Sequence, residues 1–476
     1  MLFTSYTFII FLLVVLPLCF FLGRKAQNLF LLVASAVFYG AWDWRFLGLL
    51  YFSVLLDYGC GAQIARSRTN RRKRAFLLLS VAVNLGVLGF FKYFNFFTES
   101  FVEFLSLAGF ESGFHPWNIV LPLGISFYTF QSMSYTIDVY RGNSEPVKNF
   151  TDFALYVTFF PQLVAGPIER ATTLLPQIVS PRGAQWSDFR EGSFLVLSGY
   201  FKKMVIADNL ARYVEYVFDS EHPESIAGFN VLLGLYCFAF QIYGDFAGYT
   251  DIARGVAKWM GFDLQVNFRR PYLAPSPSEY WKRWHISLTT WLRDYLYIPL
   301  GGSRCSSGKV YRNVFLTMTI GGLWHGAAGH FVIWGVVWGI FLVAHRMRSE
   351  TFAWRIDGGS GLKTFGHVLS VVLTFHLTCL LMILFRVRSM EAFWTLSSRL
   401  FGDFQPDEMA RSMLSALVYY VVPYLVFEIV EEVLAKGKNE DVKPRWWLRT
   451  PQAAFMIALL ISHGALDGAR FIYFQF

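Results

Sequence analysis

A histidine flanked by glycines is the residue of this chain best suited to acid–base chemistry. It lies in the run Gly321-Gly-Leu-Trp-His325-Gly326, between stretches apolar enough to lie in a bilayer. Histidine exchanges a proton near neutral pH, and an ionisable side chain at membrane depth is rarely kept without a function. The alternative is a core histidine that bonds a backbone carbonyl. The glycines favour a functional role, because they let backbone or a ligand approach the imidazole closely.

Composition indicates a polytopic membrane protein. The chain is 55% hydrophobic and 16% charged, whereas soluble domains have roughly 25% charged residues. The net charge of +9 is then attributed to basic cytoplasmic loops and not to nucleic-acid binding. The cysteines are scattered without a CxxC pair, so neither a metal site nor a disulfide framework is predicted. They are Cys19, Cys60, Cys237, Cys305 and Cys379.

Apolar segments predict an all-α fold with roughly ten or more transmembrane helices. Several segments are short or interrupted by Gly and Pro, as in 153–167, which predicts re-entrant or broken helices buried in protein. The first segment is not expected to be a cleavable signal, because it has no basic n-region and no evident small-residue cleavage site. No internal repeat of the kind found in transporters is evident. The segments are 6–22, 27–42, 46–64, 75–97, 119–138, 192–208, 229–250, 313–345 (expected to be broken), 366–385, 412–434 and 452–468.

Loop charges predict the orientation in the membrane. Arg24 and Lys25 follow the first segment, and a basic cluster at 66–74 follows the third. Between Lys92 and Arg141 there is no Lys or Arg. By the positive-inside rule, the N-terminus and the 98–118 loop are extracytoplasmic.

An aromatic and basic stretch at 280–300 offers a second site. Trp281, Trp284, Leu288, Trp291 and Tyr295 recur at steps of three and four, which predicts one aromatic helical face in the membrane interface. The surrounding cations either attract anionic lipid or bind a polyphosphorylated donor, since Arg forks match phosphate oxygens. Composition leaves both readings open. The cations are Arg269, Arg270, Lys282, Arg283, Arg293, Arg304, Lys309 and Arg312.

Four further polar side chains lie within apolar segments. Asp245 and Asp251 close one segment; they either orient His285 or Arg293, or bond hydroxyls and backbone, and the structural role is favoured. Tyr128 and Gln131 share one helical face and either line a tunnel or form a packing stripe.

Several co-linear strings resemble the membrane-bound O-acyltransferase family, and within it the bacterial branch of alginate O-acetyltransferase membrane subunits. The peptidoglycan O-acetyltransferases, cellulose acetylation subunits and D-alanyl teichoic acid transferases share the same core. The strings are Trp281–Gly302, Gly321–Gly326, Leu121–Phe130, Ile137–Gly142, Ala165–Ile168, Tyr243–Asp251 and Phe471–Phe476.

The resemblance implies a single membrane domain over 1–476, a ring of helices around a tunnel that joins the two faces of the membrane. Its parts would be N-terminal helices (1–140), a catalytic core with re-entrant and interfacial helices (141–345) and C-terminal helices (346–476). His325 would be the catalytic base. Relatives often carry a second histidine where this chain has Trp338, so the helper is open among His285, His330, His345 and His376.

The implied activity is acetyl transfer from cytoplasmic acetyl-CoA, without a metal, to an extracytoplasmic polysaccharide such as alginate, cellulose or peptidoglycan. The place would be the bacterial inner membrane, and a periplasmic SGNH-type transferase would act as partner. The expected donor contacts are Lys282, Arg283, Arg293, Arg304 and Trp324, and the expected tunnel residues are Tyr128, Gln131, Asp245 and Asp251. Three alternatives remain: another acyl group such as D-alanyl, a small-molecule or proton-coupled transporter, and a non-catalytic scaffold.

Overall fold

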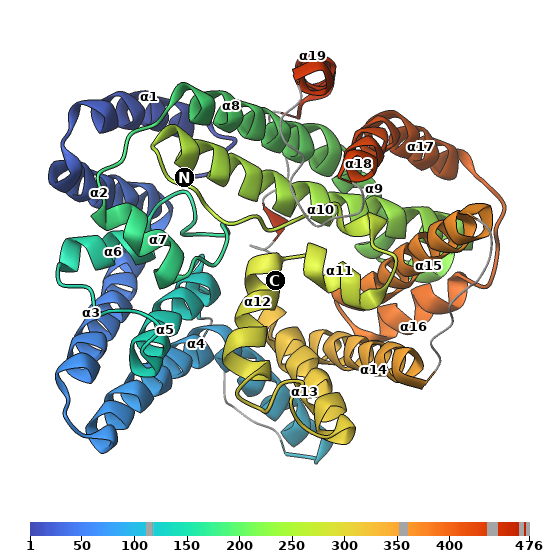
Figure 1. Ribbon diagram of the computed structural model, residues 1–476. Helices are drawn as coiled ribbons and strands as arrows, with labels where there is room; N and C mark the ends of the chain where they lie inside the picture. Colours follow the sequence, from blue (N-terminus) through green and yellow to red (C-terminus); the bar gives the residue numbers. More distant parts are fainter. Residues whose placement is uncertain (111–116, 118, 352–359, 436–445, 466–470, 473–476) are drawn as a thin grey trace. The chain divides into compact units, whose positions relative to one another are not determined.

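The structure, a computed structural model, describes residues 1–110, 117, 119–351, 360–435, 446–465 and 471–472. The regular elements in these residues are all helical, as the sequence predicts (Figure 1). They belong to two compact units, each of which is built from separate stretches of the chain. The first unit is Met1–Val196 with Thr250–Gln265, and the second is Leu197–Tyr249 with Val266–Phe476.

The first unit holds the N-terminal helices. Inside it, α3, α4 and α5 surround the buried carboxylate of Asp57, which accepts hydrogen bonds from Ser80 (2.5 Å), Asn84 (2.9 Å) and Ser132. A carboxylate at this depth is tolerated because hydroxyl and amide donors satisfy it. The helices are α1 (Tyr6–Phe21), α2 (Arg24–Asp43), α3 (Arg45–Arg66), α4 (Asn70–Leu107), α5 (Ile125–Arg141), α6 (Phe150–Thr158), α7 (Ala171–Val179), most of α8 (Trp186–Tyr200) and the end of α10 (Gly228–Trp259).

The second unit holds both His285 and His325. It begins with the end of α8 and includes most of α10. Its other elements are the π-helix η1 (Phe201–Ala207), α9 (Asp208–Phe218), the short 3-10 helices η2 (Pro223–Ser225) and η3 (Pro271–Leu273), α11 (Pro277–Arg283), α12 (Ile286–Leu292), the π-helix η4 (Arg293–Tyr297), α13 (Ser307–His325), α14 (Gly329–Thr351), α15 (Ser360–Arg386), α16 (Met390–Arg399), α17 (Glu408–Ala416), the π-helix η5 (Leu417–Val421), α18 (Val422–Leu434) and α19 (Trp446–His463).

Six helical stretches in the described residues are long and apolar enough to cross a membrane, fewer than the ten or more expected from sequence. Other apolar segments form helices that are shorter or more polar, such as α5. The predicted break within 313–345 is confirmed, because α13 ends at His325 and α14 begins at Gly329. The six stretches are Arg45–Arg66, Asn70–Leu107, Gly228–Trp259, Gly329–Arg348, Thr364–Arg386 and Glu408–Leu434.

The prediction of one amphipathic interfacial helix over 280–300 is wrong. The chain leaves the helix at Trp284 and His285, between α11 and α12, and α12 then widens into the π-helix η4. Trp281, Trp284 and Trp291 are all buried inside the protein. The spacing of three and four arose from two short helices that each pack an aromatic side inward.

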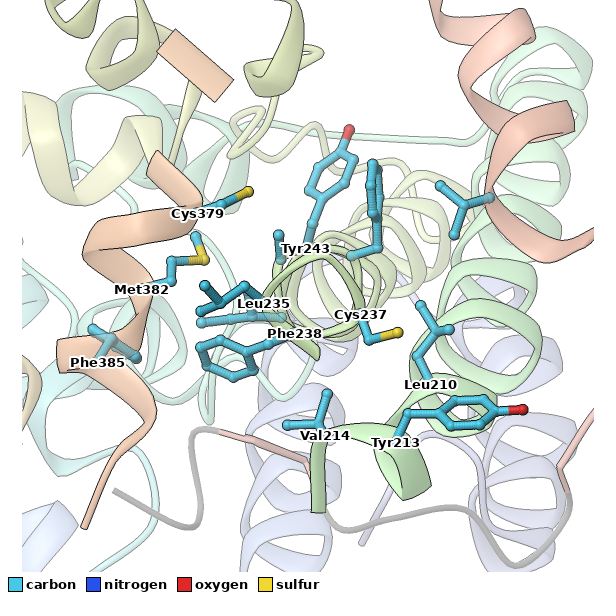
Figure 2. Packing of buried hydrophobic residues seen from close by; sticks show 14 of the residues in the cluster. Leu210, Tyr213, Val214, Leu235, Cys237, Phe238, Tyr243, Cys379, Met382 and Phe385 are labelled. Carbon is cyan, nitrogen blue, oxygen red and sulfur yellow. The ribbon is translucent and has the colours of Figure 1, made fainter. Parts of the chain in front are cut away.

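The core of the second unit surrounds α10. Figure 2 shows α10 with Leu235, Cys237, Phe238 and Tyr243 pointing outward, between α9 on one side and α15 on the other. Side chains from α15, among them Phe385, pack against this face. Both helices are long and apolar enough to cross a membrane, where close packing and not removal from water holds helices together.

The predicted interruption of the helix within 153–167 is confirmed. Helix α6 ends at Thr158, and the chain from Phe159 to Arg170 is buried without regular helix. Glu169 anchors this stretch: its carboxylate accepts from the backbone N–H of Gln265 (2.6 Å) and from the hydroxyl of Thr173 (3.2 Å). Burial raises the pKa of the Glu169 carboxyl to about 7, although these donors oppose the rise.

The raised pKa of Glu169 predicts a pH-dependent stability. The folded protein keeps this proton at a pH where the unfolded chain has lost it, so the stabilisation is present below the ordinary pKa and is lost as pH rises towards about 7. The melting temperature of the purified protein should therefore fall between about pH 5 and pH 7.5. Glu169→Gln should make that fall shallower. Glu145→Gln, at an exposed position, is the control, and equal slopes in all three proteins would contradict the assignment.

Candidate functional site

His325 is the last residue of α13, and its imidazole is buried among aromatic rings. Its ring centroid lies 5.1 Å from that of Trp324, 5.2 Å from that of Trp334 and 5.3 Å from that of Phe385. The Trp334 and Phe385 rings meet it nearly edge-on, at 88° and 76°. The side chain keeps 5% of its surface exposed. An imidazole in such an apolar lining is shielded from bulk water, so its interactions with neighbouring polar groups are stronger than they would be at the surface.

Glycines bring α13 against α14 and so determine where His325 lies. A Cβ at Gly322 would be 2.4 Å from the carbonyl oxygen of Phe331, and one at Gly335 would be 2.5 Å from that of Met318. At Gly326 a Cβ would overlap the Phe331 ring at 2.1 Å. Gly322 and Gly326 thus allow a neighbouring helix to approach closely. From the sequence, these glycines could have made room for either backbone or a ligand, and the structure shows backbone and a side chain of α14 there.

The second histidine of the site is His285, which is completely buried. Its ring centroid is 6.5 Å from that of His325, 4.7 Å from that of Phe246 and 5.9 Å from that of Trp324. Burial lowers the pKa of the His285 imidazole well below its ordinary range, and the nearby His325 lowers it further. His285 is therefore neutral at physiological pH, and a neutral imidazole carries one acceptor and one donor nitrogen.

The remaining candidate helpers lie against other groups. The Nδ1 atom of His330 is 3.0 Å from the carbonyl oxygen of Leu384, and that of His345 is 3.4 Å from the Ser278 hydroxyl. The Nε2 atom of His376 is 2.9 Å from the hydroxyl of Tyr236. Among the described histidines, His285 is thus the one with a ring contact to His325.

Trp338 takes the position where a second histidine was expected. Its ring is almost completely buried and stacks parallel to that of Tyr280, with centroids 5.4 Å apart and planes at 2°. It also meets the ring of Trp281 edge-on at 5.4 Å. This position therefore packs α14 against α11 and has no part in proton exchange.

A cavity of about 780 Å³ adjoins α11, α12, η4, α13 and α14. Three cations line it, together with apolar and hydroxyl side chains. Lys282 and Arg293 were predicted from the sequence as donor contacts, whereas Arg346 was not. Its position beside Arg348, at the end of an apolar segment, could have indicated a basic site. The lining residues are Ser278, Trp281, Lys282, Ile286, Thr289, Thr290, Arg293, Tyr297, Val314, Thr317, Met318, Leu342, His345 and Arg346.

The five residues predicted to contact the donor do not lie together in the structure. Lys282 and Arg293 line the cavity, and Trp324 lies with the two histidines. Arg304 is exposed on the turn before α13. Arg283 is 4% exposed and forms ion pairs with Glu432 of α18 (3.0 Å) and Glu279 (3.4 Å), so its charge is already matched within the protein.

Aromatic side chains connect the cavity to His325. Trp281 lines the cavity, and its ring meets that of Trp334 edge-on at 5.8 Å. The Trp334 ring also contacts that of His325, at 5.2 Å. Met318, two turns before His325 on α13, also lines the cavity. The His325 imidazole and the cationic cavity are therefore connected through the rings of Trp334 and Trp281.

The predicted tunnel residues fall in different units, and the tunnel stays a prediction. In the first unit, Tyr128 is buried, Gln131 donates to the carbonyl of Tyr156 (2.5 Å), and Asp251 is 3.8 Å from Arg254.

In the second unit, Asp245 binds the ammonium group of Lys203 (2.9 Å) and accepts from the backbone N–H of Ile472 (2.6 Å). Lys203 also pairs with Asp208 at 2.8 Å. These contacts match the structural alternative for Asp245. Among the described residues, no group of three or more His, Cys, Asp and Glu side chains is placed to hold a metal ion.

Comparison with known proteins gives a consistent result. The family model described as "membrane-bound O-acyltransferase family" matches residues 147–387. The chain is 40% identical to the probable alginate O-acetylase of Pseudomonas aeruginosa, over 90% of this chain and 80% of that protein. It is 39% identical to the protein of the same name from Pseudomonas putida over the full length of both. Identity to the peptidoglycan O-acetyltransferase of Helicobacter pylori is 35%, over 78% of this chain and 74% of that protein.

The helix contact that places His325 predicts different effects at two adjacent glycines. Gly322→Ala should destabilise the protein by about 1–3 kcal/mol, because its Cβ meets backbone atoms that cannot move aside. Gly321→Ala meets only the end of the Leu292 side chain, at 3.3 Å, and should be nearly neutral. Thermal unfolding in detergent measures both. Equal melting temperatures of the two variants would show that this contact does not hold the helices.

Proposed function

Because this chain belongs to the membrane-bound O-acyltransferase family, we propose that it transfers acetyl groups from cytoplasmic acetyl-CoA to hydroxyl groups of an extracytoplasmic polysaccharide. The chain is an O-acyltransferase and a multi-pass membrane protein. The observation that carries the finer proposal is the buried pair of imidazoles, His325 and His285, which ring contacts through Trp334 and Trp281 connect to a cationic cavity.

The proposed chemistry is attack of an alcohol on a thioester, with His325 as general base. The imidazole takes the proton of the acceptor hydroxyl while the oxygen attacks the thioester carbonyl. The carbon–sulfur bond of the tetrahedral intermediate then breaks, and the imidazolium returns its proton to the thiolate. The products are an acetyl ester and the free thiol of CoA. His285, neutral and close by, is proposed to hold the hydroxyl or the His325 ring in the reactive orientation.

The cavity beside α11 and α14 is the proposed binding place of the donor. Lys282, Arg293 and Arg346 provide three positive charges for the phosphates of CoA, and the rim of Trp281 and Tyr297 suits an adenine or the pantetheine chain. The volume of about 780 Å³ lies in the range of small-molecule sites, roughly 300–1,000 Å³. The thioester end would then reach past Trp281 and Trp334 towards His325.

The orientation proposed for the chain follows the distribution of basic residues. Arg68 lies in the short connection between the apolar stretches Arg45–Arg66 and Asn70–Leu107, and Arg66, Arg71 and Arg72 lie at the adjoining ends of these stretches. Such a cluster stays in the cytoplasm. The N-terminus is then extracytoplasmic, and the proposed location is the bacterial inner membrane.

The acceptor is proposed to be a polysaccharide of the cell envelope or matrix, because relatives carry the names alginate O-acetylase and peptidoglycan O-acetyltransferase. Between the two, the higher identity favours an alginate-like polymer. The family resemblance also supports a periplasmic SGNH-type partner that delivers the acetyl group to the polysaccharide. On this proposal the isolated chain consumes acetyl-CoA slowly and does not acetylate intact polymer.

His325→Gln is the variant that tests the catalytic assignment. Glutamine keeps a similar volume and hydrogen-bonding capacity but cannot accept the proton, so acetyl transfer should fall by about 10² to 10⁴ while the melting temperature stays near that of the wild type. The measurement is release of CoA thiol from acetyl-CoA by the purified protein. His330→Gln, on the adjoining helix, is the control and should retain activity. Near-normal turnover by His325→Gln would refute the assignment and make His285 the next residue to test.

Arg346→Ala and Lys282→Ala test the donor site. Each removes one charge facing the cavity, so KM for acetyl-CoA should rise about three- to tenfold, while kcat changes little because proton transfer is untouched. Arg348→Ala, two residues further along the same helix and outside the cavity lining, is the matched control. Unchanged KM in both cavity variants, or the same rise in Arg348→Ala, would place the donor elsewhere.

A further inference from the structure

Two residues of the second unit adopt a left-handed backbone that glycine normally takes. Arg270 has φ 47° and His285 has φ 44°, and among the described residues other than glycine they are the two with positive φ. This conformation is unfavourable for side chains with a Cβ, and it persists only where the surrounding structure enforces it. One of the two is a histidine of the candidate site.

The two strained residues belong to one small backbone assembly. The segment 267–270 runs beside 283–287, with the N–H of Arg269 donating to the carbonyl of Arg283 (3.0 Å) and that of Ile286 donating to the carbonyl of Asn267 (2.9 Å). The amide oxygen of Asn267 also accepts from the N–H of Ser287 (3.1 Å). The turn at His285 is therefore set by how the 267–270 segment is held.

One carboxylate holds both sides of this assembly. The Oε2 atom of Glu432, on α18, accepts from Nε of Arg270 at 2.7 Å. Its Oε1 atom lies 3.0 Å from Nη1 of Arg283. The two guanidinium side chains are 9% and 4% exposed and the carboxylate is 18% exposed, so solvent screens these pairs little.

Three other acids near this assembly, Glu428 and Glu431 of α18 and Glu279 of α11, make different sets of contacts. Glu431 approaches Arg270 only at 3.7 Å. Glu428, one turn earlier, accepts hydrogen bonds from the hydroxyls of Tyr243 and Tyr424, the latter at 2.8 Å. Glu279 reaches Arg283 at 3.4 Å and also pairs with Lys282 at 3.3 Å. Compared with these three acids, Glu432 is the one that contacts both Arg270 and Arg283.

We propose that Glu432 is a positioning residue for the acyl-transfer site: it clamps Arg270 and Arg283 together and thereby enforces the strained turn that aims His285 at His325. The proposal rests on the proposed function, in which His285 orients the reacting groups. The clamp lies outside the lining of the donor cavity, so it acts on turnover and leaves donor affinity alone. An ångström of misplacement at a reacting centre can cost on the order of 10² in rate.

Glu432→Asp tests the clamp. Aspartate keeps the negative charge beside the arginines but is one methylene shorter, so it cannot span both guanidinium groups. The expected result is a kcat for CoA-thiol release that is about 10- to 100-fold lower, with KM for acetyl-CoA within about twofold of wild type and a similar melting temperature. Glu431→Asp makes the same shortening at the adjacent residue and should leave kcat unchanged.

Two kinetic results would overturn the proposal. In one, Glu432→Asp turns over at the wild-type rate, whether or not its melting temperature falls, which would make the clamp merely structural. In the other, Glu431→Asp loses kcat to the same extent, which would reflect a general disturbance of α18.

A structural readout separates this proposal from the proposed function. Cryo-EM maps of wild type and Glu432→Asp in lipid nanodiscs show whether the His285 ring leaves its position 6.5 Å from the His325 ring. If wild type releases no CoA thiol but the ring is displaced in Glu432→Asp, the acetyl-CoA proposal fails and the clamp stands. An unmoved ring overturns the clamp, whatever the activity.

Discussion

The close contact between α13 and α14 is the feature on which the rest of the site depends. Gly322 and Gly335 allow the two backbones to approach at a distance that any side chain would prevent. That approach places His325 at the end of α13 under the rings of Trp334 and Phe385. Phe385 is in turn held by the packing of α15 on α10 (Figure 2). The imidazole of His325, the proposed base, is thus shielded from water by the same contacts that stabilise the second unit.

Polar groups that support this arrangement are neutralised within the protein. Asp245 is matched by Lys203, and Arg270 and Arg283 are matched by Glu432. A buried charge is costly unless paired and hydrogen-bonded. Two cations of the cavity are also paired, Lys282 with Glu279 (3.3 Å) and Arg293 with Asp294 (2.7 Å), but their side chains are more than half exposed. The ion pairs that hold the fold are therefore buried, whereas the charges proposed to hold the donor are in exposed pairs that solvent screens and that contribute little to stability.

The sequence was sufficient to predict the all-helical class, the break between α13 and α14, and the interruption within 153–167. Gly, Pro and apolar runs determine these features locally. It was insufficient for the 280–300 stretch, where two short helices imitate the period of one. The break at His285 depends on Asn267 and Glu432, which are distant in sequence.

Side-chain partners were also beyond local patterns. Arg283 and Lys282 are adjacent in sequence, yet one is buried against Glu432 and the other faces the cavity. No periodicity distinguishes them. His285 could be named among several candidate helpers, but its selection over His330 required the ring contact with His325.

A cryo-EM structure of the protein in lipid nanodiscs tests the donor site and the catalytic base together, if the protein is bound to an acetyl-CoA analogue in which a methylene group replaces the thioester sulfur. This analogue carries a ketone and cannot transfer its acetyl group. We expect its phosphates against Lys282, Arg293 and Arg346, and its ketone carbonyl within about 4 Å of the His325 imidazole or one water away from it. An analogue bound with its phosphates outside this cavity, or with its carbonyl remote from His325, would contradict both assignments.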